Sequence, residues 1–189
     1  MKIIKSRIFK ILIALFIVGF FLGIISNLLM NDNNSIINYF SLIEQNKFNY
    51  FSSLINSIFT NYKYALIIWI SGIVFFLSFI IPFIIVFRGI SVGFTICGII
   101  CSFKLKGLLY ALIFLIPSIL INELVYLFLS YYSINFSLKV FNAIKNNKLI
   151  NIKSFSKNYL YIFLIFLGIL LMSSLFEIYI TSNIIKFVI

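Results

Sequence analysis

The run Ile11–Met30, ILIALFIVGFFLGIISNLLM, contains no charged residue. A helix that crosses a bilayer needs about 20 apolar residues, because roughly 30 Å of hydrocarbon must be covered at about 1.5 Å per residue. The basic residues before the run would also suit a secretory signal peptide. However, the run is too long for one, and no Ala-x-Ala-like cleavage site follows it. We therefore predict a retained membrane span over residues 11–30.

Four more apolar segments follow, and we predict spans over residues 64–87, 89–103, 108–132 and 159–180. The third span, 89–103, has only 15 residues. As a straight helix it reaches about 22 Å, so it needs a thinned bilayer or flanking charges that snorkel to the surface. Neither repeats nor a linker divide the chain. The sequence predicts one all-α domain over residues 1–189, a polytopic membrane helix bundle with about five transmembrane helices.

The composition excludes whole classes of function. Hydrophobic residues make up 63% of the 189 residues and charged residues 10%, whereas a soluble domain carries about a quarter charged residues. The net charge of +11 reflects the presence of only four acids, so it does not indicate a nucleic-acid partner. With no histidine and two cysteines, the chain offers neither a disulfide framework nor a zinc cluster. We predict no cofactor and no metal site.

The distribution of basic residues predicts the topology. Cytoplasmic segments of membrane proteins are enriched in Lys and Arg. If all five spans cross and the amino terminus lies inside, 10 of the 15 basic residues are cytoplasmic: Lys2, Lys5, Arg7, Lys10, Arg88, Lys139, Lys145, Lys148, Lys153 and Lys157. We therefore predict a multi-pass protein of the bacterial cytoplasmic membrane, with its amino terminus inside and its carboxyl terminus outside.

Two segments between the spans carry a pattern of their own. In the predicted outer segment, 31–63, apolar and polar residues alternate with the helical period, which predicts an extracytoplasmic amphipathic helix. This helix either lies on the outer leaflet or against the bundle, or it docks a partner. The candidate partner face comprises Phe48, Phe51, Ile55, Ile58 and Tyr62. The inner segment, 133–157, holds five lysines and no acid. These lysines fix the topology, and they could also bind anionic lipid.

Small side chains recur every four residues along the predicted third span, at Gly89, Gly93, Cys97 and Cys101. Membrane helices associate through close backbone packing, because lipid supplies no hydrophobic drive between them. The stripe therefore predicts close helix packing, and it would serve an internal contact or a homo-oligomer equally well. A four-residue Cys spacing without further ligands builds no metal site.

Glu123 is an acid inside the predicted fourth span, preceded by Asn122 and, six residues earlier, by Pro117. An ionised acid in a span costs about 3 kcal/mol or more unless it is paired or faces a cavity. Pro117 predicts a kink. Arg88, placed at the inner junction of spans two and three, is the candidate cation. Three roles for Glu123 stay open: a structural polar lock, a proton or ion site, and a protein contact.

The sequence also argues against catalysis within the membrane. Intramembrane hydrolysis requires a metal motif, an aspartyl pair, or a serine with a base such as histidine. The chain has no histidine, and its only aspartate is Asp32. We therefore predict that it is not an enzyme.

The central stretch 87–95, FRGISVGFT, together with the five-span layout, resembles the stage II sporulation protein M family. That family carries a basic-Gly-x-x-x-Gly-Phe-Thr run followed by a Pro-led span, often with a later Glu. Pro117 and Glu123 resemble this pair, whereas the His-Gly that commonly follows the proline is Ser118-Ile119 here.

The resemblance implies a non-enzymatic scaffold of the engulfment machinery of endospore-forming bacteria. Its partners would be membrane-anchored peptidoglycan-degrading proteins at the sporulation septum, the stage II sporulation proteins D and P. The main alternative is a small permease or ion-conducting subunit that uses Glu123 and Arg88. A membrane immunity or stress protein is a third reading.

Overall fold

The computed structural model describes residues 6–30, 37–38, 41, 49–112, 116–145 and 152–181. Over these ranges the chain is helical and contains no strand. Four segments are long and apolar enough to cross a membrane: Arg7–Met30, Phe75–Leu109, Ile119–Lys145 and Ser156–Tyr179. The prediction of an all-α, polytopic membrane helix bundle is confirmed.

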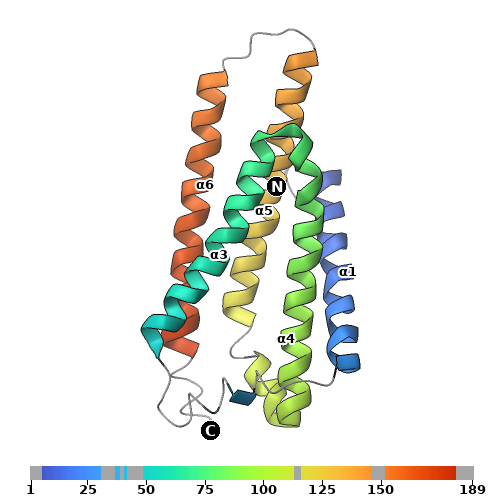
Figure 1. Cartoon of the computed structure of the whole chain (residues 1–189), viewed down its shortest axis with the longest axis vertical. Coiled ribbons are helices and arrows are strands. Elements are labelled where there is room, and N and C mark those ends of the chain that lie inside the picture. Colours follow the sequence, from blue (N-terminus) through green and yellow to red (C-terminus); the bar gives the residue numbers. More distant parts are fainter. Residues whose placement is uncertain are drawn as a thin grey trace.

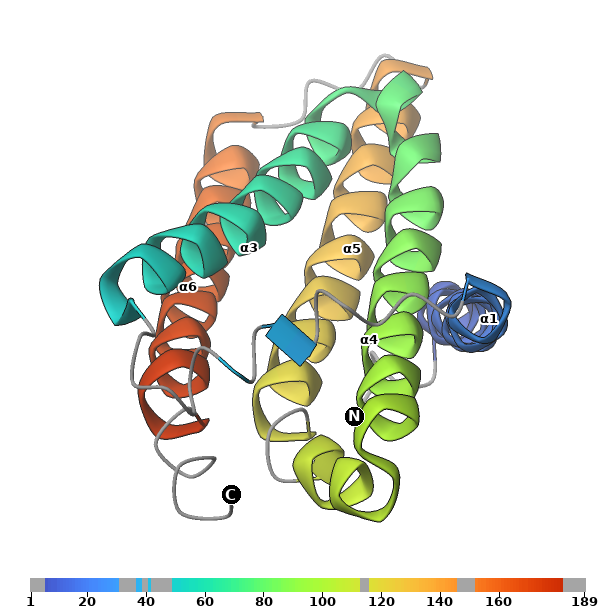
Figure 2. The same cartoon turned by 60° about the horizontal axis from the view of Figure 1, so that its bottom comes forward.

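Five long helices form the bundle (Figure 1). They are α1 (Arg7–Met30), α3 (Tyr50–Ile73), α4 (Ile80–Tyr110), α5 (Ile116–Lys145) and α6 (Ile152–Leu175), with a 3₁₀ helix, η1 (Phe75–Phe79), before α4 and a π-helix, η3 (Phe176–Thr181), after α6. Figure 1 shows that α3 is joined to α4 at one end and leans away from it toward the other. Figure 2 shows α1 on the outer side of α4, away from α3 and α6.

The predicted second span, 64–87, is wrong as one helix. The chain leaves helical geometry at Val74, whose backbone is extended (φ −95°, ψ 108°), and α4 starts at Ile80. The hydroxyl of Ser78 donates a hydrogen bond to the carbonyl oxygen of Phe75 (2.6 Å), which satisfies a backbone acceptor in the apolar turn. Because the reversal lies inside a run without charged residues, from Ala65 to Phe87, the hydropathy pattern does not reveal it.

The amphipathic stretch is the first half of α3, continuous with the apolar residues up to Ile73. The side chain of Asn49 caps this helix by accepting a hydrogen bond from the backbone N–H of Ser52 (3.3 Å). The predicted end of the amphipathic segment at residue 63 is therefore wrong, whereas packing of this helix against the bundle, one of the predicted arrangements, is observed. Most of the predicted outer segment, at 31–36, 39–40 and 42–48, lies outside the described residues.

Helix α4 runs from Ile80 to a sharp reversal at Lys104 (φ 52°, ψ −124°). Its straight part, Ile80–Phe103, spans about 36 Å, which is enough to cross the hydrocarbon core. The prediction that Arg88 lies at a junction between two spans is therefore wrong, because Arg88 is about 12 Å inside this helix. After the reversal the chain returns so closely that a Cβ on Gly107 would collide with the carbonyl oxygen of Ile99.

Helix α5 also differs from its predicted bounds. The predicted fourth span starts at residue 108, whereas α4 continues to Tyr110 and α5 begins at Ile116. Pro117 is thus in the first turn of α5, where its missing N–H has no intrahelical acceptor to lose. The predicted kink of this span at Pro117 is wrong, because the proline opens the helix.

A seam of four glycines joins α1 to α4. Along α1, a Cβ on Gly19 or Gly23 would collide with the backbone of α4 at Val86 or Ile90. Along α4, a Cβ on Gly89 or Gly93 would collide with backbone oxygens of α1. Residue numbers rise together along the two helices, from Gly19 and Val86 to Gly23 and Ile90, so α1 and α4 are parallel and in backbone contact. Such contact is the packing that the Gly-x-x-x-Gly pattern permits in lipid.

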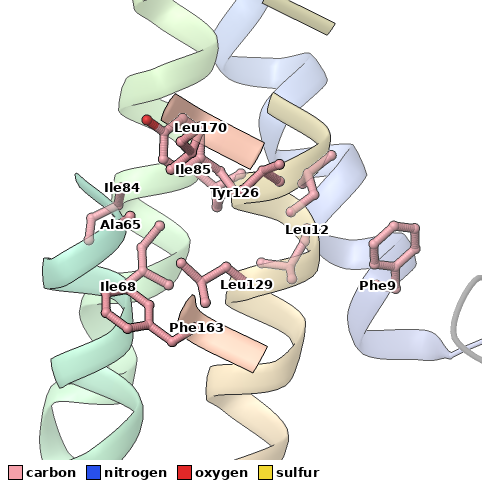
Figure 3. Close-up of a cluster of buried hydrophobic side chains, with 12 residues drawn as sticks. Phe9, Leu12, Ala65, Ile68, Ile84, Ile85, Tyr126, Leu129, Phe163 and Leu170 are labelled. Atoms are coloured by element: carbon pink, nitrogen blue, oxygen red, sulfur yellow. The ribbon is translucent and has the colours of Figure 1, made fainter. Parts of the chain in front are cut away.

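The apolar core surrounds α5, and Figure 3 shows side chains of all five long helices in it. Its buried members include Leu12 of α1, Ile68 of α3, Ile85 of α4, Leu129 of α5 and Leu170 of α6. Helix α5 is thus the central element of the bundle. Its polar residues Asn122 and Glu123 are buried inside the bundle rather than exposed to lipid.

Candidate polar site between α3, α4, α5 and η3

Arg88 and Glu123 form a buried ion pair between α4 and α5. The Nη2 atom of Arg88 lies 2.6 Å from Oε1 of Glu123, and Nε donates to the same oxygen at 3.0 Å. The two side chains are 13% and 6% exposed. Burying either charge alone would carry a large desolvation cost, and pairing with the opposite charge offsets much of it.

Aromatic rings complete the environment of the guanidinium. The Cζ atom of Arg88 lies 4.4 Å from the ring centroid of Tyr126 and 5.2 Å from that of Tyr64. Both distances are within the range of cation–π attraction, which strengthens when the cation is desolvated. Arg88 is therefore held by α5 through Glu123 and Tyr126, and by α3 through Tyr64.

A chain of hydrogen bonds continues from the ion pair to α6. The hydroxyl of Tyr126 donates to the backbone oxygen and to Oδ1 of Asn61, both at 3.1 Å. The amide of Asn61 donates to the hydroxyl of Ser174 (3.1 Å), which donates in turn to the carbonyl oxygen of Leu170 (3.0 Å). The polar face of α3 thus faces the interior of the bundle, where it joins α5 to α6.

A second carboxyl group lies nearby, in η3. The hydroxyl of Ser57 donates to Oε2 of Glu177 at 3.3 Å. Among the described residues, Glu177 forms no ion pair. The site therefore combines one cation with two carboxyl groups.

These groups border a cavity of about 350 Å³. Its lining residues come from α3, α4, α5 and η3: Asn56, Ser57, Thr60, Asn61, Arg88, Ser91, Val92, Thr95, Ile119, Asn122 and Glu177. All but two of them are polar. Ser91 and Thr60 are exposed, so the cavity opens to the surface between the diverging helices.

Two buried oxygen atoms at the site accept no hydrogen bond within the described part of the chain. They are Oδ1 of Asn122, a residue that lines the cavity and is 4% exposed, and Oε2 of Glu123. Buried polar atoms are rarely left unpartnered, because each one costs about 1–3 kcal/mol. These atoms can accept from water or from a bound donor or cation.

The structure brings together three of the residues that the sequence singled out, Arg88, Asn122 and Glu123. Pro117 opens α5, and its side chain lies outside the described residues. Gly89 and Gly93 pack on α1. Of the other two residues in the small-residue stripe, Cys97 is buried and Cys101 is exposed, and their sulfur atoms are 3.9 Å apart. The close backbone contact thus involves the first half of the stripe.

The candidate partner face lies on the outer side of α3. Phe51 and Ile55 are exposed, whereas Ile58 and Tyr62 are half-buried. Phe48 lies outside the described residues. A nearly apolar groove of about 650 Å³ follows this side of the helix, and its lining adds Phe59, Lys63, Leu66 and Ile67.

Sequence reasoning missed several members of the site. The sequence pattern does not single out Glu177, and Ser57 and Asn61 fall in the predicted outer segment, 31–63. The signal for Gly19 and Gly23 was present, because the two residues form a Gly-x-x-x-Gly pattern inside an uncharged run. No sequence signal identifies Tyr126 among the eleven tyrosines.

A bundle of long apolar helices that encloses an ion pair and an open polar cavity defines a polytopic integral membrane protein. The sequence model of one family, Stage II sporulation protein M, matches residues 12–182. The chain belongs to this family. It is therefore a sporulation-related membrane protein. The family is not known as an enzyme family. No curated protein and no solved structure shows significant similarity to it.

Proposed function

We propose that this chain is a non-enzymatic scaffold of the sporulation engulfment machinery. It anchors peptidoglycan-degrading proteins at the septal membrane, and its direct partners are the stage II sporulation proteins D and P. The family assignment supports this role, as does the division of the molecule into a well-connected interior and a broad apolar outer face. The chemistry of peptidoglycan cleavage belongs to the partners.

The observation that carries the proposal is the outer face of α3. Phe51 and Phe59 are 72% and 71% exposed, and Lys63 is exposed beside them in the middle of the helix. Helix α3 is not among the described segments that are apolar enough to cross a membrane, and Lys63 interrupts its exposed apolar side. A partner helix with an acidic residue at this position would pair with Lys63, while its apolar residues filled the groove.

The same proposal includes a topology. Given the order of the helices, the start of α1, the α3–α4 turn and the end of α5 share one end of the bundle. Lys10, Lys139 and Lys145 belong to that end, which we assign to the cytoplasm. The reversal at Lys104 and η3 lie at the opposite end and face outward. The polar cavity then lies toward the outer side of the membrane.

The experiment is a mild-detergent purification of the tagged protein from sporulating cells, with identification of the proteins that are retained. We expect peptidoglycan hydrolases, in amounts that fall several-fold for Phe51→Ser and Ile55→Ser. The matched control is Ile144→Ser, an equally exposed apolar residue near the end of α5. Equal recovery from all three variants would contradict a partner face on α3.

The polar cavity favours one alternative, a small permease or ion-conducting subunit that uses Glu123 and Arg88. Glu123→Gln alone is a poor test, because it leaves Arg88 as an unpaired buried charge. The double variant Arg88→Gln/Glu123→Gln removes both charges and preserves side-chain size. The scaffold proposal expects sporulation to proceed with this variant. Loss of sporulation despite normal retention of partners would favour the permease.

A further inference from the structure

We propose that the cavity between α3, α4, α5 and η3 binds a monovalent cation. The ligands would be the carboxylate of Glu177, Oδ1 of Asn122 and hydroxyl groups of the lining residues. This site is independent of the scaffold role, since it concerns a different face of α3.

The charges at the site favour a cation over an anion. The short contacts of the Arg88 guanidinium go to Glu123, so that charge is already balanced. Glu177 has a neutral partner, the hydroxyl of Ser57, and no ion pair among the described residues. The cavity wall therefore carries one carboxyl group more than its cations balance. In the ionised form of Glu177 this is one excess negative charge, which a cation would neutralise and an anion would oppose.

The unpartnered oxygen of Asn122 supplies an independent indication. Its side chain is almost fully buried, it lines the cavity, and Oδ1 accepts no hydrogen bond from the described residues. An amide oxygen in this position is satisfied by a cation or by the donor of a bound group. Ser91 and Thr95 of α4, which also line the cavity, add hydroxyl oxygens.

The donor set and the space indicate the kind of cation. All of these ligands are hard oxygen atoms, which suit alkali and alkaline-earth ions or ammonium groups and not soft transition metals. Only one carboxylate is unbalanced, so a single positive charge matches the site. A volume of about 350 Å³ exceeds that of a bare ion, so there is room for a hydrated alkali cation or a small organic ammonium.

The experiment is thermal unfolding of the whole protein in nanodiscs, at constant ionic strength. The probes are Na⁺, K⁺ and ethanolammonium, and N-methyl-D-glucamine is the bulky reference cation. We expect a saturable rise of about 5 °C in the unfolding midpoint with at least one probe, because a ligand that binds only the folded state stabilises it. The responding probe distinguishes an inorganic ion from an organic amine.

Two variants test the site itself. Glu177→Gln should abolish the rise, and Ser91→Ala, a mild change at the cavity mouth, should shift the midpoint of the titration several-fold to higher concentration. Asn142→Ala, on an exposed part of α5, is the matched control and should behave as the parent protein. The proposal is overturned if no probe exceeds the reference cation, or if the rise persists unchanged in both cavity variants.

Discussion

The two sides of α4 are built in opposite ways. On one side, Gly89 and Gly93 bring its backbone against α1 with no space for a methyl group. On the other side, Arg88 and Ser91 face a cavity, and the neighbouring α3 diverges from α4 (Figure 1). The first contact is dry and made by backbone atoms, whereas the second is polar and made by long side chains.

This difference shows how a membrane helix can be fixed on one face and open on the other. Close glycine packing gains dispersion contacts along the whole seam. Because the two backbones are in contact, no larger side chain fits between the helices. The polar side depends instead on a few strong contacts, chiefly those of Arg88 with Glu123 and Tyr126. A change on the polar side should therefore act through charge and hydrogen bonding, and a change on the glycine side through sterics.

The largest effect is expected from Glu123→Gln. Removing one partner of a buried ion pair leaves the other charge uncompensated, which lowers the free energy of unfolding by about 3–5 kcal/mol. SDS titration of the protein in mixed micelles measures this loss. The double variant Arg88→Gln/Glu123→Gln should recover a large part of it. A single variant as stable as the parent would show that the pair is solvated.

Adding a single methyl group in the glycine seam should lower the free energy of unfolding somewhat less than Glu123→Gln does. In Gly93→Ala, the added methyl group collides with the carbonyl oxygen of Phe20, so α1 must move away from α4. We expect a loss of about 2 kcal/mol in the same titration. Gly168→Ala is the control, because nothing lies within 4 Å of its added carbon, and alanine favours the helix. Equal behaviour of the two variants would refute the close contact.

The smallest effect is expected from Tyr126→Phe. The ring that covers Arg88 stays, whereas the hydroxyl that donates to Asn61 is lost. The free energy of unfolding should fall by about 1 kcal/mol, the typical net value of a hydrogen bond. Tyr161→Phe, at a residue that is 66% exposed, should change nothing measurable. A larger loss for Tyr161 would contradict the assigned network.

The sequence sufficed to predict the class of fold, because long uncharged runs such as residues 11–30 have one stable solution in a bilayer. It failed at the turn between α3 and α4. Hydropathy carries little information there, since all but Ser78 of the turn residues from Val74 to Phe79 are apolar. A weaker signal was present in Ser71-Gly72 before the turn and Pro82 in the first turn of α4.

The error at the turn also misplaced the site. Because α4 begins at Ile80, Arg88 lies inside the bundle and not at the membrane surface, where the sequence predicts it. The same turn places the polar residues of α3 opposite α5. The approach of Arg88 to Glu123 could be suggested from sequence, because two opposite charges inside a membrane favour pairing. Glu177 could not be added in the same way, since its approach to Ser57 joins residues 120 positions apart.

The inward polar face of α3 has a consequence for the order of biogenesis. When α1 leaves the translocon it can rest in lipid alone, because its apolar surface needs no partner. Helix α3 emerges later with Ser57 and Asn61 exposed, and their partners Glu177 and Ser174 follow them by 120 and 113 residues. We therefore expect α3 to join the bundle only after α5 and α6 have been translated.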